Sequence, residues 1–191
     1  MIFQRDASMF AGSNAYLFKH EMLREVAYES VLLRTRPAYH KQVADWLVQE
    51  SGERVAEYAG LIADHYEKAE QWLAAAHMYE KAGIRAQELA NPELALSHFQ
   101  KVLQLIAQEP HENNWKIAIQ ERMAHLLATQ ARLVEATDMF SLMRHMAELD
   151  GDLLAQTKAL TGYSRLQYAQ QQYNSASQSA EKSRANCLVS G

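Results

Sequence analysis

The sequence predicts an all-α fold built from pairs of short helices. Among 191 residues only 7 are glycine and 3 are proline, so tight turns should be rare. Ala, Leu, Gln and Glu, which are good helix formers, are abundant. Small residues at Ala63 and Ala75 stand where two helix backbones would approach each other. Larger side chains that would fill the gaps between them are Ile62, Tyr66, Trp72 and Tyr79.

The N-terminal part of the chain differs from the rest. Two short apolar runs, Met1–Gln4 and Tyr16–Lys19, flank turn-forming residues, and this pattern predicts a β-hairpin. Helices are expected over residues 21–33 and from Pro37 to residue 50, because proline is tolerated in a first helical turn. Gly52 follows the last turn, as glycine commonly does. Aromatic residues expected to pack this module on the following helices are Tyr16, Phe18, Tyr28, Tyr39 and Trp46.

From Val55 onward the whole sequence predicts helix. Asn91-Pro92 fits an N-cap followed by proline at the first helical position. Pro110 separates the next pair, and Asp150-Gly151-Asp152 provides a stop followed by a new cap. The expected helices cover about 55–69, 72–90, 92–107, 113–130, 132–148, 152–170 and 173–187.

The paired helices carry a recurring spacing. The pattern Ile62-Ala63-x-x-Tyr66, then Ala75-x-x-x-Tyr79-x-x-Ala82, resembles the tetratricopeptide repeat, a helix–turn–helix unit of about 34 residues. A second copy comprises Met123, Ala124, Leu127, Leu133, Ala136, Phe140 and Met143. A weaker third copy comprises Tyr163, Ser164, Gln167, Tyr173, Ala176 and Ala180. An irregular pair between the first two copies holds the same offsets at Gly83, Ala86, Ala95, Phe99 and Val102. The helix over residues 72–90 is therefore expected to serve two pairings.

The segment before the repeats resembles a linker in bacterial STAND-type signalling ATPases, which are often fused to adenylate or guanylate cyclase or to protein-kinase domains. The matching residues are Tyr16, Phe18 and His20, then Glu25, Ala27 and Tyr28, then Arg36 and His40. The resemblance implies a winged-helix-like linker module over 1–54 (a β-hairpin and two helices). It also implies tetratricopeptide-like repeats over 55–191, in about three helix pairs, following an ATPase. The chain itself contains no Gly-x-x-x-x-Gly-Lys-Ser/Thr loop.

Composition argues against several classes of function. The net charge is −4 and the isoelectric point is about 6.1, so nucleic-acid and membrane surfaces are not expected as partners. Basic residues Arg34, Arg36 and Lys41 are offset by neighbouring carboxylates, although a DNA-binding regulator stays a third possibility. No apolar run reaches the ~20 residues that cross a bilayer, and the N-terminus has no signal-peptide pattern. We therefore expect a cytoplasmic protein.

The sequence offers no catalytic, metal or cofactor site. Eight histidines occur, and none forms a His-Glu-x-x-His pair: His20, His40, His65, His77, His98, His111, His125 and His145. The single cysteine, Cys187, has no recognisable catalytic signature around it. We expect no enzyme activity in this chain.

The resemblance to tetratricopeptide arrays points to a concave groove lined by the first helix of each pair. The acidic run over residues 50–70 otherwise reads as ordinary solvated helix surface. The residues implied to face the groove are Glu57, Gly60, Asp64, Glu67, Lys68, Glu121, His125, Thr129, Lys158, Arg165 and Tyr168. They are mixed in sign and lack the dense Lys/Arg set that would clamp a peptide carboxylate.

These observations favour a non-catalytic interaction or sensor scaffold. Its expected partners are a protein or peptide in the groove and the ATPase or cyclase domain of a larger parent protein. A homodimer is also possible. The alternative is a stand-alone peptide-binding adaptor, and the sequence preceding Met1 in the source gene would discriminate between the two.

Overall fold

The computed structural model describes residues 2–5, 10, 14–107, 109, 112–153, 155–166 and 168, and these residues are mostly helical. The predicted all-α class is confirmed, because neighbouring helices pack against each other in sequence order. The chain divides into two compact units, residues 1–106 and 107–191, which are described separately. The predicted boundary at 54/55 falls inside the first unit, between two helices that pack together. Its meaning as a domain boundary stays a prediction.

The first unit opens with a two-stranded antiparallel hairpin, as predicted. β1 (Ile2–Arg5) pairs with β2 (Ala15–Phe18), with Ile2 opposite Phe18. Helix α1 (Glu21–Glu29) follows and ends earlier than the predicted residue 33. The Ser30 hydroxyl donates to the Ala27 carbonyl at 2.6 Å, and the chain then forms a 3₁₀ turn over Leu33–Thr35. Short polar side chains compete in this way with the helical backbone, so the helix ends.

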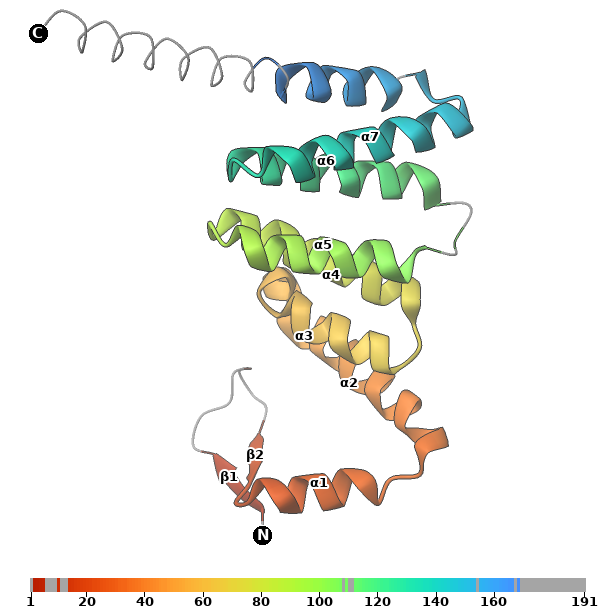
Figure 1. Cartoon of the computed structure of the whole chain (residues 1–191). Helices are drawn as coiled ribbons and strands as arrows, with labels where there is room; N and C mark the ends of the chain where they lie inside the picture. The colour runs from red at the N-terminus through yellow and green to blue at the C-terminus, as the bar shows by residue number, and fades with distance from the viewer. Residues whose placement is uncertain are drawn as a thin grey trace, which may run out of the picture. The chain divides into compact units, whose positions relative to one another are not determined.

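Four helices build the rest of the first unit: α2 (Arg36–Ser51), α3 (Val55–Lys68), α4 (Trp72–Glu88) and α5 (Pro92–Leu105). Each packs on the next, so α4 contacts both α3 and α5, as expected for a shared helix (Figure 1). The predicted end signals act as expected. Gly52 has a φ of +49°, and the Asn91 side chain accepts a hydrogen bond from the Leu94 N–H.

Small residues allow the helices of this unit to approach closely. Ala63 and Ala75 are fully buried, as is Ile62. A Cβ atom on Gly83 would lie 2.6 Å from the ring of Phe99, so only glycine fits there without movement. Trp72 was expected in this interior, but it is 46% exposed. It is the first residue of α4, where a side chain projects beyond the helix contact.

The N-terminal module is attached differently from the prediction. Phe10, which the sequence did not single out, is buried, and its ring centroid lies 5.3 Å from Trp46 and 4.9 Å from Tyr58. The Tyr28 hydroxyl lies 3.0 Å from His40 Nε2, a contact within the predicted 1–54 module. All five predicted aromatic residues keep exposed surface, from 37% at Phe18 to 60% at Tyr16, so their packing is at most partial.

The second unit contains α6 (Asn113–Thr129) and α7 (Leu133–Asp150), which pack together, and a further helix whose described residues include 155–166 (Figure 1). Gly151 ends α7 in the left-handed region at φ +71°, and Asp152 caps the next helix by accepting from the Ala155 N–H. Both were predicted. A Cβ atom on Gly162 would lie 2.3 Å from the Phe140 ring, which places the third helix against α7.

Several predicted features lie outside the described residues. They are Pro110, His111, Gln167, Cys187, the helix over 173–187, and the third-copy residues Tyr173, Ala176 and Ala180. Within the described parts of the chain, no helix has the length and apolarity needed to cross a membrane.

Candidate inner faces of the two units

In the first unit, three of the five groove residues predicted on α3 face α5: Gly60, Asp64 and Glu67. A Cβ atom on Gly60 would lie 3.5 Å from the His98 ring, and Lys101 Nζ lies 2.9 Å from Glu67 Oε1. These contacts join two helices that are separated in sequence by α4. We call the surface formed by Gly60, Asp64, Glu67, His98 and Lys101 the first inner face.

Tyr79 of α4 organises the carboxylates of the first inner face. Its hydroxyl lies 2.6 Å from Asp64 Oδ1 and 2.6 Å from Glu67 Oε2, so it donates its one proton to one carboxylate at a time. The Tyr79 ring also stacks on His98, with centroids 5.7 Å apart. Burial and the two carboxylates strongly raise the pKa of Tyr79. The phenol therefore stays protonated and acts as a fixed donor.

Charge on the first inner face is held in place by this network. Burial raises the pKa of Glu67, but the hydrogen bonds from Tyr79 and Lys101 outweigh burial and lower it overall. For His98, burial is the main cause of a lowered pKa, and the nearby Asp64 carboxylate opposes it. The face thus presents an ionised carboxylate beside a largely neutral imidazole.

Two predicted residues of α3 lie apart from this network. Glu57 is exposed and forms an ion pair, at 2.7 Å, with Arg54, which lies one turn before it in the sequence. Lys68 is exposed and lines a different pocket, beside Arg24 and Tyr28. The structure therefore brings Asp64 and Glu67 together but leaves Glu57 and Lys68 outside the first inner face.

The second unit repeats the arrangement of a carboxylate and a lysine from two helices. A pocket of about 200 Å³ lies between α6 and the helix of residues 155–166, and we call its lining the second inner face. Four of the predicted groove residues line it, together with Thr157, Thr161 and Gly162: Glu121, His125, Lys158 and Arg165. Lys158 Nζ lies 3.2 Å from Glu121 Oε2. The His125 ring meets Phe140 of α7 edge to face, with centroids 5.4 Å apart.

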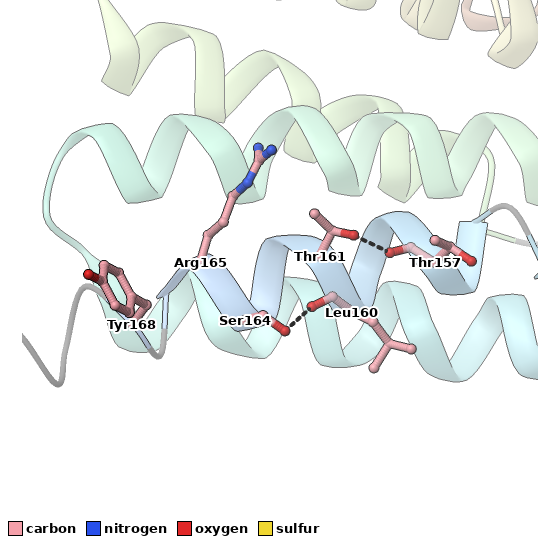
Figure 2. A pocket seen from close by; sticks show the side chains of 6 residues that line it. All are labelled: Thr157, Leu160, Thr161, Ser164, Arg165 and Tyr168. Carbon is pink, nitrogen blue, oxygen red and sulfur yellow. Dashed lines mark hydrogen bonds between the residues drawn. The ribbon is translucent and has the colours of Figure 1, made fainter.

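An adjoining open pocket of about 640 Å³ extends the second inner face along the third helix (Figure 2). Arg165 lines both pockets, and Tyr168 lies at the far end of the larger one. The hydroxyls of Thr161 and Ser164 each donate to a carbonyl of their own helix at 2.8 Å. The predicted Thr129 likewise bonds to Leu126 of its own helix and does not line either pocket.

Sequence reasoning missed His98 and Lys101. Their helix belonged to the irregular pair, for which no inner face was assigned. A signal was nevertheless present, because Lys101 lies 34 residues after Glu67, which is one repeat length. His98 stands at the same interval after Asp64.

Both inner faces present charged side chains held by ion pairs. Among the described residues, no group of three or more His, Cys, Asp or Glu side chains is placed to hold a metal ion. The sequence matches no protein-family model, and no curated protein matches it either.

Proposed function

We propose that this chain is a non-catalytic protein-interaction module whose inner faces bind a protein or peptide segment. One observation carries the proposal. In each unit, a carboxylate pairs with a lysine two helices further along the chain, through Glu67–Lys101 and Glu121–Lys158. A helical array that fixes its charges before binding loses less side-chain entropy when a partner arrives.

The repeats that form these faces are, in this proposal, of the tetratricopeptide type. Support comes from the 34-residue interval between the paired Glu67 and Lys101, and from close helix contacts at Ala63 and Ala75. Repeats of this kind stack into extended binding surfaces and seldom carry out chemistry.

The mixed charge of the faces favours a partner that carries both signs. Glu121 and Lys158 are already paired, whereas the structure gives Arg165 no ion pair with another described residue. Arg165 is exposed and lines two adjoining pockets, so it is the cation on the second inner face most available to an acidic side chain of the partner.

Selection from a random linear peptide library displayed on phage tests this proposal. Enriched peptides should bind the whole chain and lose affinity by about fivefold for Arg165→Gln, the value of a partly exposed charge pair. Arg122→Gln is the matched control, since Arg122 is an exposed arginine of α6 outside both pockets. Failure to enrich any peptide, or equal binding to both variants, would contradict the proposal.

We further place the module in a larger bacterial, cytoplasmic signalling ATPase or nucleotide cyclase, where partner binding would act allosterically on the catalytic domain. The resemblance of the N-terminal segment supports this, and three of its residues, Tyr28, Arg36 and His40, lie together in the structure. Deletion of residues 55–191 from the parent protein should change its nucleotide turnover. Unchanged turnover would refute the sensor role.

A further inference from the structure

Two adjoining pockets lie where α1 meets α2 and α3 in the first unit. One has a volume of about 340 Å³ and is lined by Tyr28, Val31, Arg36, Tyr39, His40, Val43 and His65. The other has a volume of about 410 Å³ and is lined by Arg24, Glu25, Tyr28, His40 and Lys68. Tyr28 and His40 belong to both, so they form the shared wall. Each volume lies within the range of small-molecule sites.

The first of these pockets, which we call the apolar pocket, offers an unfilled hydrophobic surface. Its exposed wall is almost entirely carbon, contributed by Val31, Val43 and the rings of Tyr28 and Tyr39. Helix α1 buries none of its own residues, so its side chains do not fill this space. A ligand with an apolar body would remove that surface from water and would also hold α1 against α2 and α3.

The second pocket, which we call the charged pocket, is predominantly cationic. Its lining includes Arg24 and Lys68, with Glu25 as the anionic residue, and Arg36 adds a third cation from the apolar pocket. Arg36 donates to the backbone carbonyls of Val31 and Glu29 and lies over the Tyr28 ring, and it forms no ion pair with a carboxylate in the described part of the chain. This local excess of positive charge contrasts with a chain whose net charge is −4.

Lys68 is the cation most available to a ligand. Arg24 is already paired with Glu21 at 3.0 Å, whereas Lys68 has no hydrogen bond or ion pair with the described residues. Lys68 is also exposed at the end of α3, so its ammonium can move toward an anion in the charged pocket. The charge of Lys68 also lowers the pKa of the nearby Glu67, but its ammonium donates no hydrogen bond to the described residues, so an incoming anion can accept one.

The shared wall contains a hydrogen-bonded chain that can adapt to an anion. His40 Nδ1 lies 3.0 Å from His65 Nδ1, and the Tyr28 hydroxyl lies 3.0 Å from His40 Nε2. One proton occupies the gap between the two Nδ1 atoms, so one ring donates and the other accepts. Burial, together with the positive charge of Lys68, lowers the pKa of both imidazoles. The wall is therefore neutral in the empty site and adds no negative charge that would repel an anion.

From this geometry we infer that the two pockets form one binding site for a small amphipathic acid, an aromatic or aliphatic carboxylate or sulfonate. Its apolar body occupies the space between Val31 and Val43, and its anionic group faces Lys68 and Arg24. The inference does not depend on the proposed peptide binding, because the residues that line these two pockets belong to neither inner face.

Fluorescence titration of the whole chain with anilinonaphthalene sulfonate tests the site, with uncharged anilinonaphthalene as the matched probe. The sulfonate should bind about fivefold more tightly than the uncharged compound, because one partly exposed charge pair supplies up to about 1 kcal/mol. Lys68→Gln should remove that advantage. Lys81→Gln, at an exposed lysine of α4 outside both pockets, should keep it.

A second variant tests the apolar pocket. Val43→Phe adds volume at a partly exposed lining residue and should weaken both probes. Equal affinity for the two probes, or equal effects of Lys68→Gln and Lys81→Gln, overturns the inference. If Val43→Phe loses its helical circular dichroism, the exposed Lys68→Gln variant still tests the site.

Sedimentation with phosphatidylglycerol vesicles distinguishes binding of a free acid from binding of a lipid surface. The protein should stay in the supernatant, and sedimentation with the vesicles overturns the proposal.

Discussion

The two units place different aromatic residues at the same position of their repeat pattern. In the first unit this residue is Tyr79, whose hydroxyl bridges Asp64 and Glu67. In the second unit it is Phe140, which has no polar atom and packs on the edge of His125. Both rings are buried. One oxygen atom therefore separates a hydroxyl shared by two carboxylates from a ring contact without a hydrogen bond.

The consequence extends to the ion pairs. Glu67 accepts from Lys101 at 2.9 and 3.3 Å and shares the Tyr79 hydroxyl, 2.6 Å away, with Asp64, so it has partners on two sides. Glu121 receives one from Lys158 at 3.2 Å. The first inner face is therefore the more rigid of the two, and the second is better suited to rearrange around a partner.

The largest expected effect on stability comes from the close contact between Gly83 and the Phe99 ring in the first unit. Gly83→Ala should destabilise the protein by about 2 kcal/mol, since overpacking against a fully buried ring costs up to about 3 kcal/mol and better helix propensity returns about 1 kcal/mol. Urea unfolding followed by circular dichroism measures the change.

Gly60→Ala is the matched control for that change, because its new Cβ would lie 3.5 Å from His98, an ordinary contact. It should stabilise the helix by up to about 1 kcal/mol. The second unit should behave like the Gly83 site, so Gly162→Ala at Phe140 should also destabilise. If Gly83→Ala raised stability as Gly60→Ala does, the close approach of α4 and α5 would be wrong.

The next effect concerns the oxygen atom that distinguishes the two units. Tyr79→Phe converts the first unit to the arrangement of the second and should cost about 1.5 kcal/mol, the low end for a hydrogen bond to a charged group. The low end applies because the carboxylates are partly exposed and can bind water instead. Tyr39→Phe, at an exposed hydroxyl, serves as the control in the same unfolding experiment. A loss no greater than that of the control would show that the bridge contributes nothing.

A smaller difference in stability is expected between substitutions of the two ion-paired lysines, Lys101 and Lys158. Lys101→Gln should cost about 0.5–1 kcal/mol and Lys158→Gln less than about 0.5 kcal/mol, because partly exposed ion pairs are worth little unless other contacts hold them. Raising the salt concentration should reduce both costs. Equal costs at low salt would mean that Tyr79 does not reinforce the Glu67 pair.

Features set by a few neighbouring residues were predictable from the sequence. The cap at Asn91 and the left-handed Gly151 depend on local backbone chemistry, and the structure has both. Contacts between distant residues were not predictable in this way. The burial of Phe10 beside Trp46 and Tyr58 depends on where the hairpin meets α2 and α3, and no local pattern encodes it.

The candidate faces show the same division. Placing Glu121, His125, Lys158 and Arg165 around one pocket followed from the repeat pattern. The pairing of Glu67 with Lys101 was missed because the irregular helix pair obscured the repeat interval. The contact between His40 and His65 joins a linker residue to a repeat residue, and periodicity within either segment gives no information about it.

The smallest effect on stability should come from a change in pH, because the histidines with lowered pKa values are only partly buried. They all lie in the first unit: His40, His65 and His98. Burial lowers the pKa of each below its usual value of 6.5. The unfolded chain therefore binds these protons more readily than the folded chain. Their contribution to stability is fully present above pH 6.5 and is lost as the pH falls through the lowered folded values. Urea unfolding between neutral pH and about pH 5 should show this loss. The double variant His40→Gln with His65→Gln should reduce the slope and leave the contribution of His98, while an unchanged slope would mean that the hydrogen-bonded pair does not titrate with folding.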